Sequence, residues 1–402
     1  MPDSNMAPAV CESRQAEFSH GLPHMLRNGK AWLVATLMIS GALGSTSGSA
    51  AATTHIEGQV QAGGSVLAGS TVSLWAASAS VPTRLGQATT SADGSFVITA
   101  DQTPDGAILY LIAAGGTPAG SQMGGDNPAI ALLAVLGGNP PAHVVVNEMT
   151  TIASVWTNAQ FLDGSAIKGP ALSLSIAAGN VPNFVDLSTG GWGAAIQDPL
   201  NGPQTPTMAN FATLADALAG CATRVSDDAC GKLFAAATPP KGDAPTDTLT
   251  VAHSIARYPW FKPERVYALL DQFYPVPKGE NYRTVPFMPY LNFSPSAWVL
   301  PLKFDGGGYR AGGKGMFDSQ GSFWIGDNFT VGWQGQDAAT FWNGHVTKFA
   351  PNGRALSPNT TGFSAAEWWA GPWAQPSTPR TTCGSPATAA SRSLCSTRMA
   401  SR

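Results

Sequence analysis

Few residues of this sequence are of types that could do chemistry together. Glu148 is a candidate general acid and His253 a candidate general base, because a carboxyl and an imidazole are common groups for proton transfer. Each lies within a helical pattern, where we expect a solvated or capping side chain instead. The sequence has no Gly-x-Ser-x-Gly elbow, no His-Glu-x-x-His helix and no phosphate-binding loop. We therefore predict no catalytic, cofactor-binding or metal-ligating residue in this chain.

Cys221 and Cys230 bracket the segment CATRVSDDAC. In an exported chain, this spacing predicts a local disulfide that ties the end of a helix to the next segment. A metal site is one alternative, but it needs further ligands nearby. The histidines that follow residue 52 all lie elsewhere in the sequence: His55, His143, His253 and His345. A reactive thiol pair is the other alternative, and nothing marks a redox motif.

Residues 25–52 have the pattern of a secretion signal. Arg27 and Lys30 form a positive start, an apolar stretch of thirteen residues covers 31–43, and small residues lead to Ala52. A membrane helix needs about 20 apolar residues, so we predict cleavage close to Thr53 rather than an anchor. We expect an exported bacterial protein, periplasmic or extracellular. We interpret residues 1–24 as an upstream extension ahead of a true start at Met25, with a long signal start as the alternative.

The composition agrees with an exported, loop-rich protein. Charged residues make up 12% of the chain, which also holds 45 glycines and 31 prolines. Low charge with many small residues favours extracellular β-structure, with partial disorder between domains as the competing interpretation. The net charge of −3 and the scattered lysines and arginines predict no nucleic-acid partner.

The first folded unit, residues 53–118, alternates apolar and polar positions. The alternating apolar residues are Ile56, Val60, Val72, Leu74, Phe96 and Ile98. This period of two is typical of half-buried strands, and Gly63-Gly64 and Asp93-Gly94 supply turns between them. With Thr90-x-x-Asp93-Gly94-x-Phe96, the segment resembles the transthyretin-like, carboxypeptidase-regulatory β-sandwich. The resemblance implies a rigid accessory domain and no activity of its own.

Residues 119–295 form a mainly helical region or linker in our interpretation. Apolar spacing predicts helices over 147–159, 207–220, 247–257 and 263–273, with Asn147 as a cap and Gly220 as a stop. The stretch between Gly179 and Pro206 shows no period, and we expect it to be irregular.

Residues 296–363 carry strand and turn motifs at close spacing. Met316-Phe317-Asp318, Phe323-Trp324-Ile325 and the strand 345–349 are each followed by turn residues, the last by Pro351-Asn352-Gly353. These motifs resemble one blade of an NHL-repeat β-propeller, of the kind in virginiamycin B lyase, with an insertion at 330–342. The resemblance implies the first blade of a truncated propeller, since propellers need about four to eight blades. Lyase residues of that family come from later blades, so none is carried over.

The last segment, residues 364–402, has no period typical of a strand or a helix. In a shifted frame, the codons of Ser377–Pro386 can encode DAKNNVWVTS, which is similar to DSQGSFWI at Asp318–Ile325. We hypothesise that a frameshift near residues 362–367 turned a second blade into this tail, and we expect the tail to be disordered. An ordinary disordered terminus is the alternative.

Taken together, the segments predict a multidomain, β-rich exported protein with an N-terminal β-sandwich, a helical middle region and a single NHL-type blade. We expect an interaction or scaffold protein that binds a protein, a glycan or a small molecule, without a cofactor and without an integral membrane segment after cleavage. A lyase similar to virginiamycin B lyase, whose catalytic blades are missing from this chain, stays as the alternative. A cell-surface structural protein is a third possibility.

Overall fold

Antiparallel sheets and helices make up the chain, whose computed structural model describes residues 52–203, 205–309, 312–327 and 345–363. The predicted upstream extension, signal peptide and tail lie outside the described residues, apart from Ala52, and so does the insertion at 330–342.

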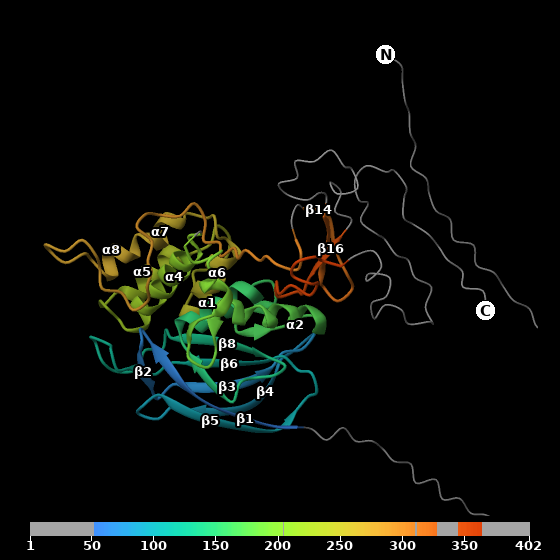
Figure 1. The fold of residues 1–402 in the computed structure, drawn as a ribbon. Coiled ribbons are helices and arrows are strands. Elements are labelled where there is room, and N and C mark those ends of the chain that lie inside the picture. The colour runs from blue at the N-terminus through green and yellow to red at the C-terminus, as the bar shows by residue number, and fades with distance from the viewer. Residues whose placement is uncertain (1–51, 204, 310–311, 328–344, 364–402) are drawn as a thin grey trace, which may run out of the picture. The chain divides into compact units, whose positions relative to one another are not determined.

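Two sheets contain the first strands (Figure 1). The first sheet has five strands: β5 (Ser95–Thr103), β1 (Ala52–Ala62), β2 (Ser65–Ala68) and β7 (Thr117–Pro118) in that order, with β9 (His143–Val146) paired to β1. The second sheet has four strands in the order β4 (Thr83–Thr89), β3 (Thr71–Ala76), β6 (Leu109–Ala114) and β8 (Ala131–Gly137). All of these pairings are antiparallel except that of β1 with β9, which is parallel.

The alternating positions predicted to face inward are buried. The predicted set is Ile56, Val60, Val72, Leu74, Phe96 and Ile98, and each is at most 4% exposed. Gly86 of β4 lies so close to Ile98 of β5 that an added Cβ would meet its side chain, so the two sheets pack against each other there. The period of two therefore identified the buried faces of both sheets.

The two sheets continue past residue 118, where we expected the β-structure to end. β8 completes the second sheet beside β6, and β9 pairs with β1 over Glu57–Val60. The sequence of β8, ALLAVLG, is almost entirely apolar because helices cover the face that solvent would otherwise reach. A strand buried on both faces shows no alternation, and so its pattern is not distinct from that of a buried helix.

Helices follow the two sheets. The longest are α1 (Glu148–Asn158), α4 (Thr207–Ala222) and α6 (Thr248–Arg257), and each begins where the apolar spacing predicts. Asn147 caps α1, accepting from the amide of Thr150, while the Thr150 hydroxyl accepts from the amide of Asn147. The predicted helix at 263–273 is divided into α7 (Pro263–Tyr267) and α8 (Leu269–Phe273).

The remaining elements were not predicted or were predicted as irregular. They are the helices α2 (Ala171–Gly179), α3 (Ala194–Gln197) and α5 (Ala229–Ala237), the 3₁₀ turn η1 (Val181–Asn183), and the short hairpins β10 (Leu162–Asp163) with β11 (Ala166–Ile167) and β12 (Val185–Asp186) with β13 (Gly191–Trp192). None of the helices in the described ranges is long and apolar enough to cross a membrane.

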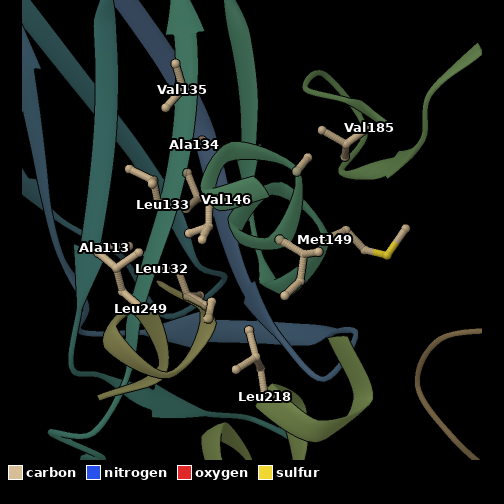
Figure 2. Close-up of a cluster of buried hydrophobic side chains, with 14 of the residues drawn as sticks. Ala113, Leu132, Leu133, Ala134, Val135, Val146, Met149, Val185, Leu218 and Leu249 are labelled. Atoms are coloured by element: carbon tan, nitrogen blue, oxygen red, sulfur yellow. The ribbon is translucent and has the colours of Figure 1, made fainter. Parts of the chain in front are cut away.

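One hydrophobic core joins the two sheets to the helices (Figure 2). Leu132 and Val135 of β8 share this cluster with Met149 of α1, Leu218 of α4 and Leu249 of α6, and all five are nearly inaccessible. Burying side chains of this size contributes about 1.5–3 kcal/mol each. The sheets and the helices therefore depend on each other for burial.

A segment without helix or strand, residues 283–303, runs along α4 and is called the strap below. Polar side chains recur at every third residue of α4 and form hydrogen bonds with the backbone of the strap. Thr207 Oγ1 donates to the carbonyl of Pro301 (2.7 Å), and Asn210 Nδ2 donates to that of Val299 (3.1 Å). Thr213 Oγ1 accepts from the amide of Leu291 (2.9 Å), and Asp216 Oδ1 accepts from that of Phe287 (2.9 Å). The α4 side chains thus supply partners that a sheet would otherwise provide.

The last described elements are β14 (Gly312–Phe317), β15 (Phe323–Asp327) and β16 (Val346–Phe349), which form a three-stranded antiparallel sheet. We call it the C-terminal sheet. Its strands coincide with the motifs at 316–318, 323–325 and 345–349.

Candidate functional site

A hollow of about 440 Å³ lies on one face of the C-terminal sheet. It is lined by five aromatic side chains and by small or neutral residues, and we call it the aromatic hollow. Its lining is Asn180, Phe304, Tyr309, Phe317, Gly321, Phe323, Ile325, Phe349, Ala350, Pro351 and Gly353. These residues carry no formal charge, so the hollow suits an uncharged, apolar group.

Strand register places the aromatic rings side by side. Phe317, Phe323 and Phe349 are direct cross-strand partners on β14, β15 and β16, so their side chains share one face. The rings of Phe317 and Phe323 lie 5.0 Å apart between centroids, and Tyr309 meets Phe349 edge-on at 6.4 Å. Phe317 is 73% exposed. Phe317 therefore adds a solvent-exposed aromatic ring to the lining of the aromatic hollow.

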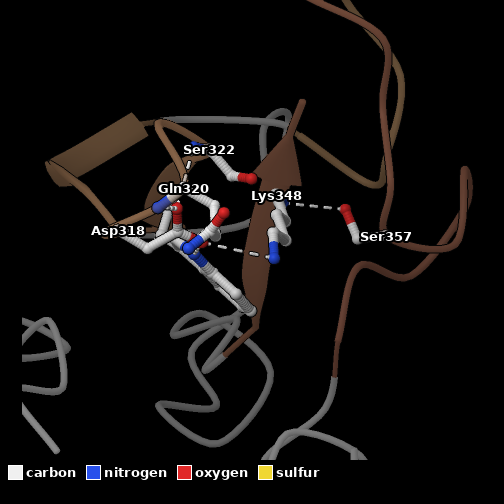
Figure 3. A network of polar contacts seen from close by, with 6 residues as sticks. Asp318, Gln320, Ser322, Lys348 and Ser357 are labelled. Atoms are coloured by element: carbon white, nitrogen blue, oxygen red, sulfur yellow. Dashed lines mark hydrogen bonds and ion pairs between the residues drawn. The ribbon is translucent and has the colours of Figure 1, made fainter. Parts of the chain in front are cut away.

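Asp318 holds the opposite face of the sheet in place (Figure 3). Its Oδ1 accepts from the amides of Gln320 (3.0 Å) and Ser322 (2.8 Å), which closes the turn between β14 and β15. Its Oδ2 accepts from Nε1 of Trp324 (2.8 Å) and lies 3.4 Å from Nζ of Lys348. That ammonium also sits 4.3 Å from the centroid of the Trp324 ring. These contacts join all three strands.

The Asp318 carboxyl is ionised in this setting. Burial by itself raises its pKa, but the hydrogen bonds from Trp324 and from the two turn amides, together with the charge of Lys348, lower it by more. The pKa of Asp318 therefore lies below its usual value, and the carboxylate stays charged near neutral pH.

Further contacts anchor the rim of the hollow. Ser357 Oγ accepts from the amide of Lys348 (3.0 Å) and donates to the carbonyl of Gly307 (2.7 Å). Asn180, which follows α2, donates to the carbonyl of Pro351 at 3.2 Å. The turn after β16 is thus tied to the residue that follows α2, and the glycine turn at 306–308 is tied to β16 through Ser357.

The two cysteines singled out by the sequence are bonded to each other. Cys221 in the last turn of α4 and Cys230 at the start of α5 form a disulfide, with Cα atoms 4.4 Å apart. Asn127 Nδ2 donates to the carbonyls of Cys221 and Ala222, at 2.9 and 3.0 Å, and so caps the C-terminus of α4. The disulfide is a structural link next to a helix end.

The structure does not bring Glu148 and His253 together. His253 is half-buried on α6, and its Nε2 lies 3.0 Å from the carbonyl oxygen of Ala159. Burial, together with the nearby charge of Arg257, lowers the pKa of His253 despite that contact. His253 also borders a second, open hollow of about 340 Å³ between α6 and the loop before it.

Glu148 has neither of the two roles that we expected for it: it is not solvated, and Asn147 rather than Glu148 caps α1. It is completely buried, and its Oε1 accepts from the amide of Gly63 in the turn between β1 and β2 (2.9 Å). The helical pattern around Glu148 placed it in a first turn, which is often exposed, but here the first sheet covers that turn. Sequence reasoning also missed Asp216, a second fully buried carboxyl, on α4.

No three His, Cys, Asp or Glu side chains gather into a metal-ligating cluster within the part of the chain that is described. No protein-family model matches the chain, and no curated protein matches it in sequence. Among solved structures, the 9R-lipoxygenase from Cyanothece PCC8801 pairs with it at 12% identity and a TM-score of 0.17, over 74% of this chain and 37% of that chain. At this TM-score the pairing carries no argument about fold or function.

Proposed function

We propose that this protein is an exported binding protein that uses the aromatic hollow to hold an uncharged, apolar group of a protein partner or of a small molecule. The observation that carries the proposal is the row of Phe317, Phe323 and Phe349 facing an open space of about 440 Å³. Ligand sites are mostly apolar, with a few polar groups that fix orientation, and here Tyr309 and Asn180 are the polar members.

The chemistry of the hollow favours binding over catalysis. Its described lining contains no carboxyl, imidazole, thiol or amine that could transfer a proton. The charged pair of Asp318 and Lys348 lies on the opposite face of the C-terminal sheet, where both residues contact Trp324 and Asp318 also bonds to the turn. We therefore prefer the interaction protein to the lyase alternative.

The finer architecture belongs to the same proposal. We propose that the first and second sheets form a transthyretin-like sandwich and that the C-terminal sheet is one NHL-type propeller blade. The antiparallel pairing of β14, β15 and β16 in sequence order supports the second assignment. Export is supported by the segment at 25–52 and by the Cys221–Cys230 disulfide, which suits an oxidising compartment.

An uncharged aromatic dye tests the binding function. We expect N-phenyl-1-naphthylamine to bind the full-length protein saturably, with a rise in fluorescence. Phe317→Ser removes the most exposed ring of the row and should weaken the dye at least fivefold, the usual effect of losing an aromatic anchor. Because Phe317 is largely exposed, this change should leave the unfolding midpoint nearly unaltered.

Val97→Ser is the matched control, since Val97 is also exposed (56%) but lies on β5. It should leave dye affinity unchanged. Equal dye affinity in the Phe317 variant and the parent protein, or no saturable binding by the parent, would refute the proposal.

A further inference from the structure

Two carboxyl groups are buried between α1 and α4 with one oxygen each left without a hydrogen bond. Glu148 on α1 and Asp216 on α4 are both 0% exposed, and the two helices are in contact. Glu148 Oε2 and Asp216 Oδ2 have no partner, although the other oxygen of each accepts a backbone amide. An ionised carboxylate in such a place loses its hydration without full compensation.

The strap brings one positive group close to Tyr274: the guanidinium of Arg283 donates to the Tyr274 carbonyl (3.1 Å) and pairs with Asp271, not with either buried carboxyl. The β1–β2 turn provides the amide of Gly63, the strap provides the amide of Phe287, and Tyr274, after α8, donates its hydroxyl to the backbone carbonyl of Asp216 (3.1 Å). Neither carboxyl forms an ion pair with any residue that the structure describes. The titratable groups that act on one another here are the two carboxyls and Tyr274.

Both carboxyls therefore favour the protonated form when the protein is folded. Burial raises the pKa of Glu148 to about 7. Burial raises the pKa of Asp216 to about 8. The hydrogen bond from Phe287 lowers this pKa, and the charge on Glu148 raises it by a smaller amount. Burial and the two carboxyls together also raise the pKa of Tyr274 well above its usual value.

The strap contacts Asp216 through the backbone of Phe287. Phe287, whose amide meets the carboxyl, is half-buried, and its neighbours Pro286 and Met288 are exposed. Lifting this stretch would admit water to Asp216, and it would uncover Leu291, a member of the shared core, and Phe287, which packs against that core, while the core residues of β8 and α1 lie on other elements.

We propose that Asp216, whose charge is coupled to that of Glu148, is a proton-operated latch: protonation of Asp216 keeps residues 284–291 of the strap closed on α4, and its ionisation releases them. In the open strap Asp216, which the strap contacts, regains an ordinary acidity near pH 4, whereas in the closed one it holds its proton. Closure is therefore strongest below about pH 4 and weakens as pH rises toward about 8, because the open form then binds fewer protons.

Hydrogen exchange of the full-length protein tests this latch. Labelling times are scaled for the intrinsic effect of pH on exchange, and protection is compared at pH 5 and pH 8.5. We expect the amides of Phe287 and Leu291 to lose at least tenfold in protection between these values, while those of β3 and β6 stay constant. In Asp216→Asn, which keeps an oxygen for the amide of Phe287, the loss should shrink to threefold or less. Glu148→Gln removes only the charge that acts on Asp216, so it should shrink the loss by a smaller factor.

Asp271→Asn is the matched control. Asp271 is an exposed carboxyl that pairs with Arg283 at the start of the strap, at 2.8 Å, so its loss alters strap contacts but not the buried pair. Its pH profile should match that of the parent. Strap protection that is independent of pH in the parent protein would overturn the latch, as would an unchanged profile in the two variants or an equal loss across β3 and β6.

Discussion

At the scale of single residues, Gly220 shows how the absence of a side chain lets a neighbouring ring pack closely against a helix. The sequence suggested that Gly220 stops its helix, but α4 continues to Ala222. The ring of Phe273 on α8 lies so close that a Cβ at position 220 would stand 2.2 Å from its Cδ2 atom. Gly220 thus permits a helix contact, and the residues that end α4 are Arg224, with a left-handed backbone (φ 50°), and the capping Asn127.

Replacing Gly220 by alanine should therefore destabilise the protein. Alanine in a helix interior ordinarily gains about 1 kcal/mol over glycine. Overpacking costs about 1–3 kcal/mol, so we expect a net loss of up to about 2 kcal/mol in the free energy of unfolding, measured in urea. Adding Phe273→Leu should restore part of that loss by making room. A stabilised Gly220→Ala protein would show that Phe273 moves aside at no cost.

At the scale of elements, the strap is the unusual part, because side chains of a helix serve as its hydrogen-bonding partners. Thr213 illustrates the arrangement: it is fully buried, and its hydroxyl meets the amide of Leu291. The buried hydroxyls and amide of Thr207, Asn210 and Thr213 would be costly in an ordinary core, and the strap gives each side chain one hydrogen-bond partner.

Thr213→Val should lower the free energy of unfolding by about 1–3 kcal/mol. Valine keeps the shape of threonine, so no cavity forms, but the buried amide of Leu291 loses its acceptor. Thr213→Ser keeps the hydroxyl and should lose less than the valine variant, even though it removes a methyl group. If chemical denaturation ranked the two variants in the opposite order, packing rather than the hydrogen bond would hold the strap.

The sequence allowed the alternating strands and the capped helices to be predicted, because their signals are local. β1, β3 and β5 show a period of two, and Asn147 precedes an apolar stripe. β8 was not predicted, because it is buried on both faces and shows no alternation. The strap was not predicted either, because its hydrogen-bonding partners lie on α4, far away in sequence.

The candidate site was predictable in part for the same reason. Phe317 and Phe323 fall within recognised strand motifs, but nothing local indicates that Phe304 and Tyr309 would join them, since the glycine turn at 306–308 sets that approach. Asp216 occupies a helix position where carboxyls are usually solvated, and only the folded structure reveals its burial.

For the whole molecule, the shared core means that the β-structure is not a separable unit. A fragment limited to 53–118 lacks β8 beside β6, β9 beside β1, and every helix that covers β8. We expect it to be unfolded, with no dispersion of amide signals in a proton–nitrogen NMR spectrum. A fragment of 52–309 keeps both sheets and the helices and should unfold cooperatively. A well-dispersed spectrum for 53–118 would show that the sheets are stable on their own.

The parallel pairing of β1 with β9 also sets the timing of folding during synthesis. The ribosome makes β1 first among the described strands, yet one of its neighbours arrives only after the whole of the second sheet has been made. Contacts between segments so distant along the chain form slowly, and the waiting strand leaves an open edge. A nascent chain of this kind stays loosely folded for longer, and the edge of β1 stays open to pairing with other chains until β9 has been made.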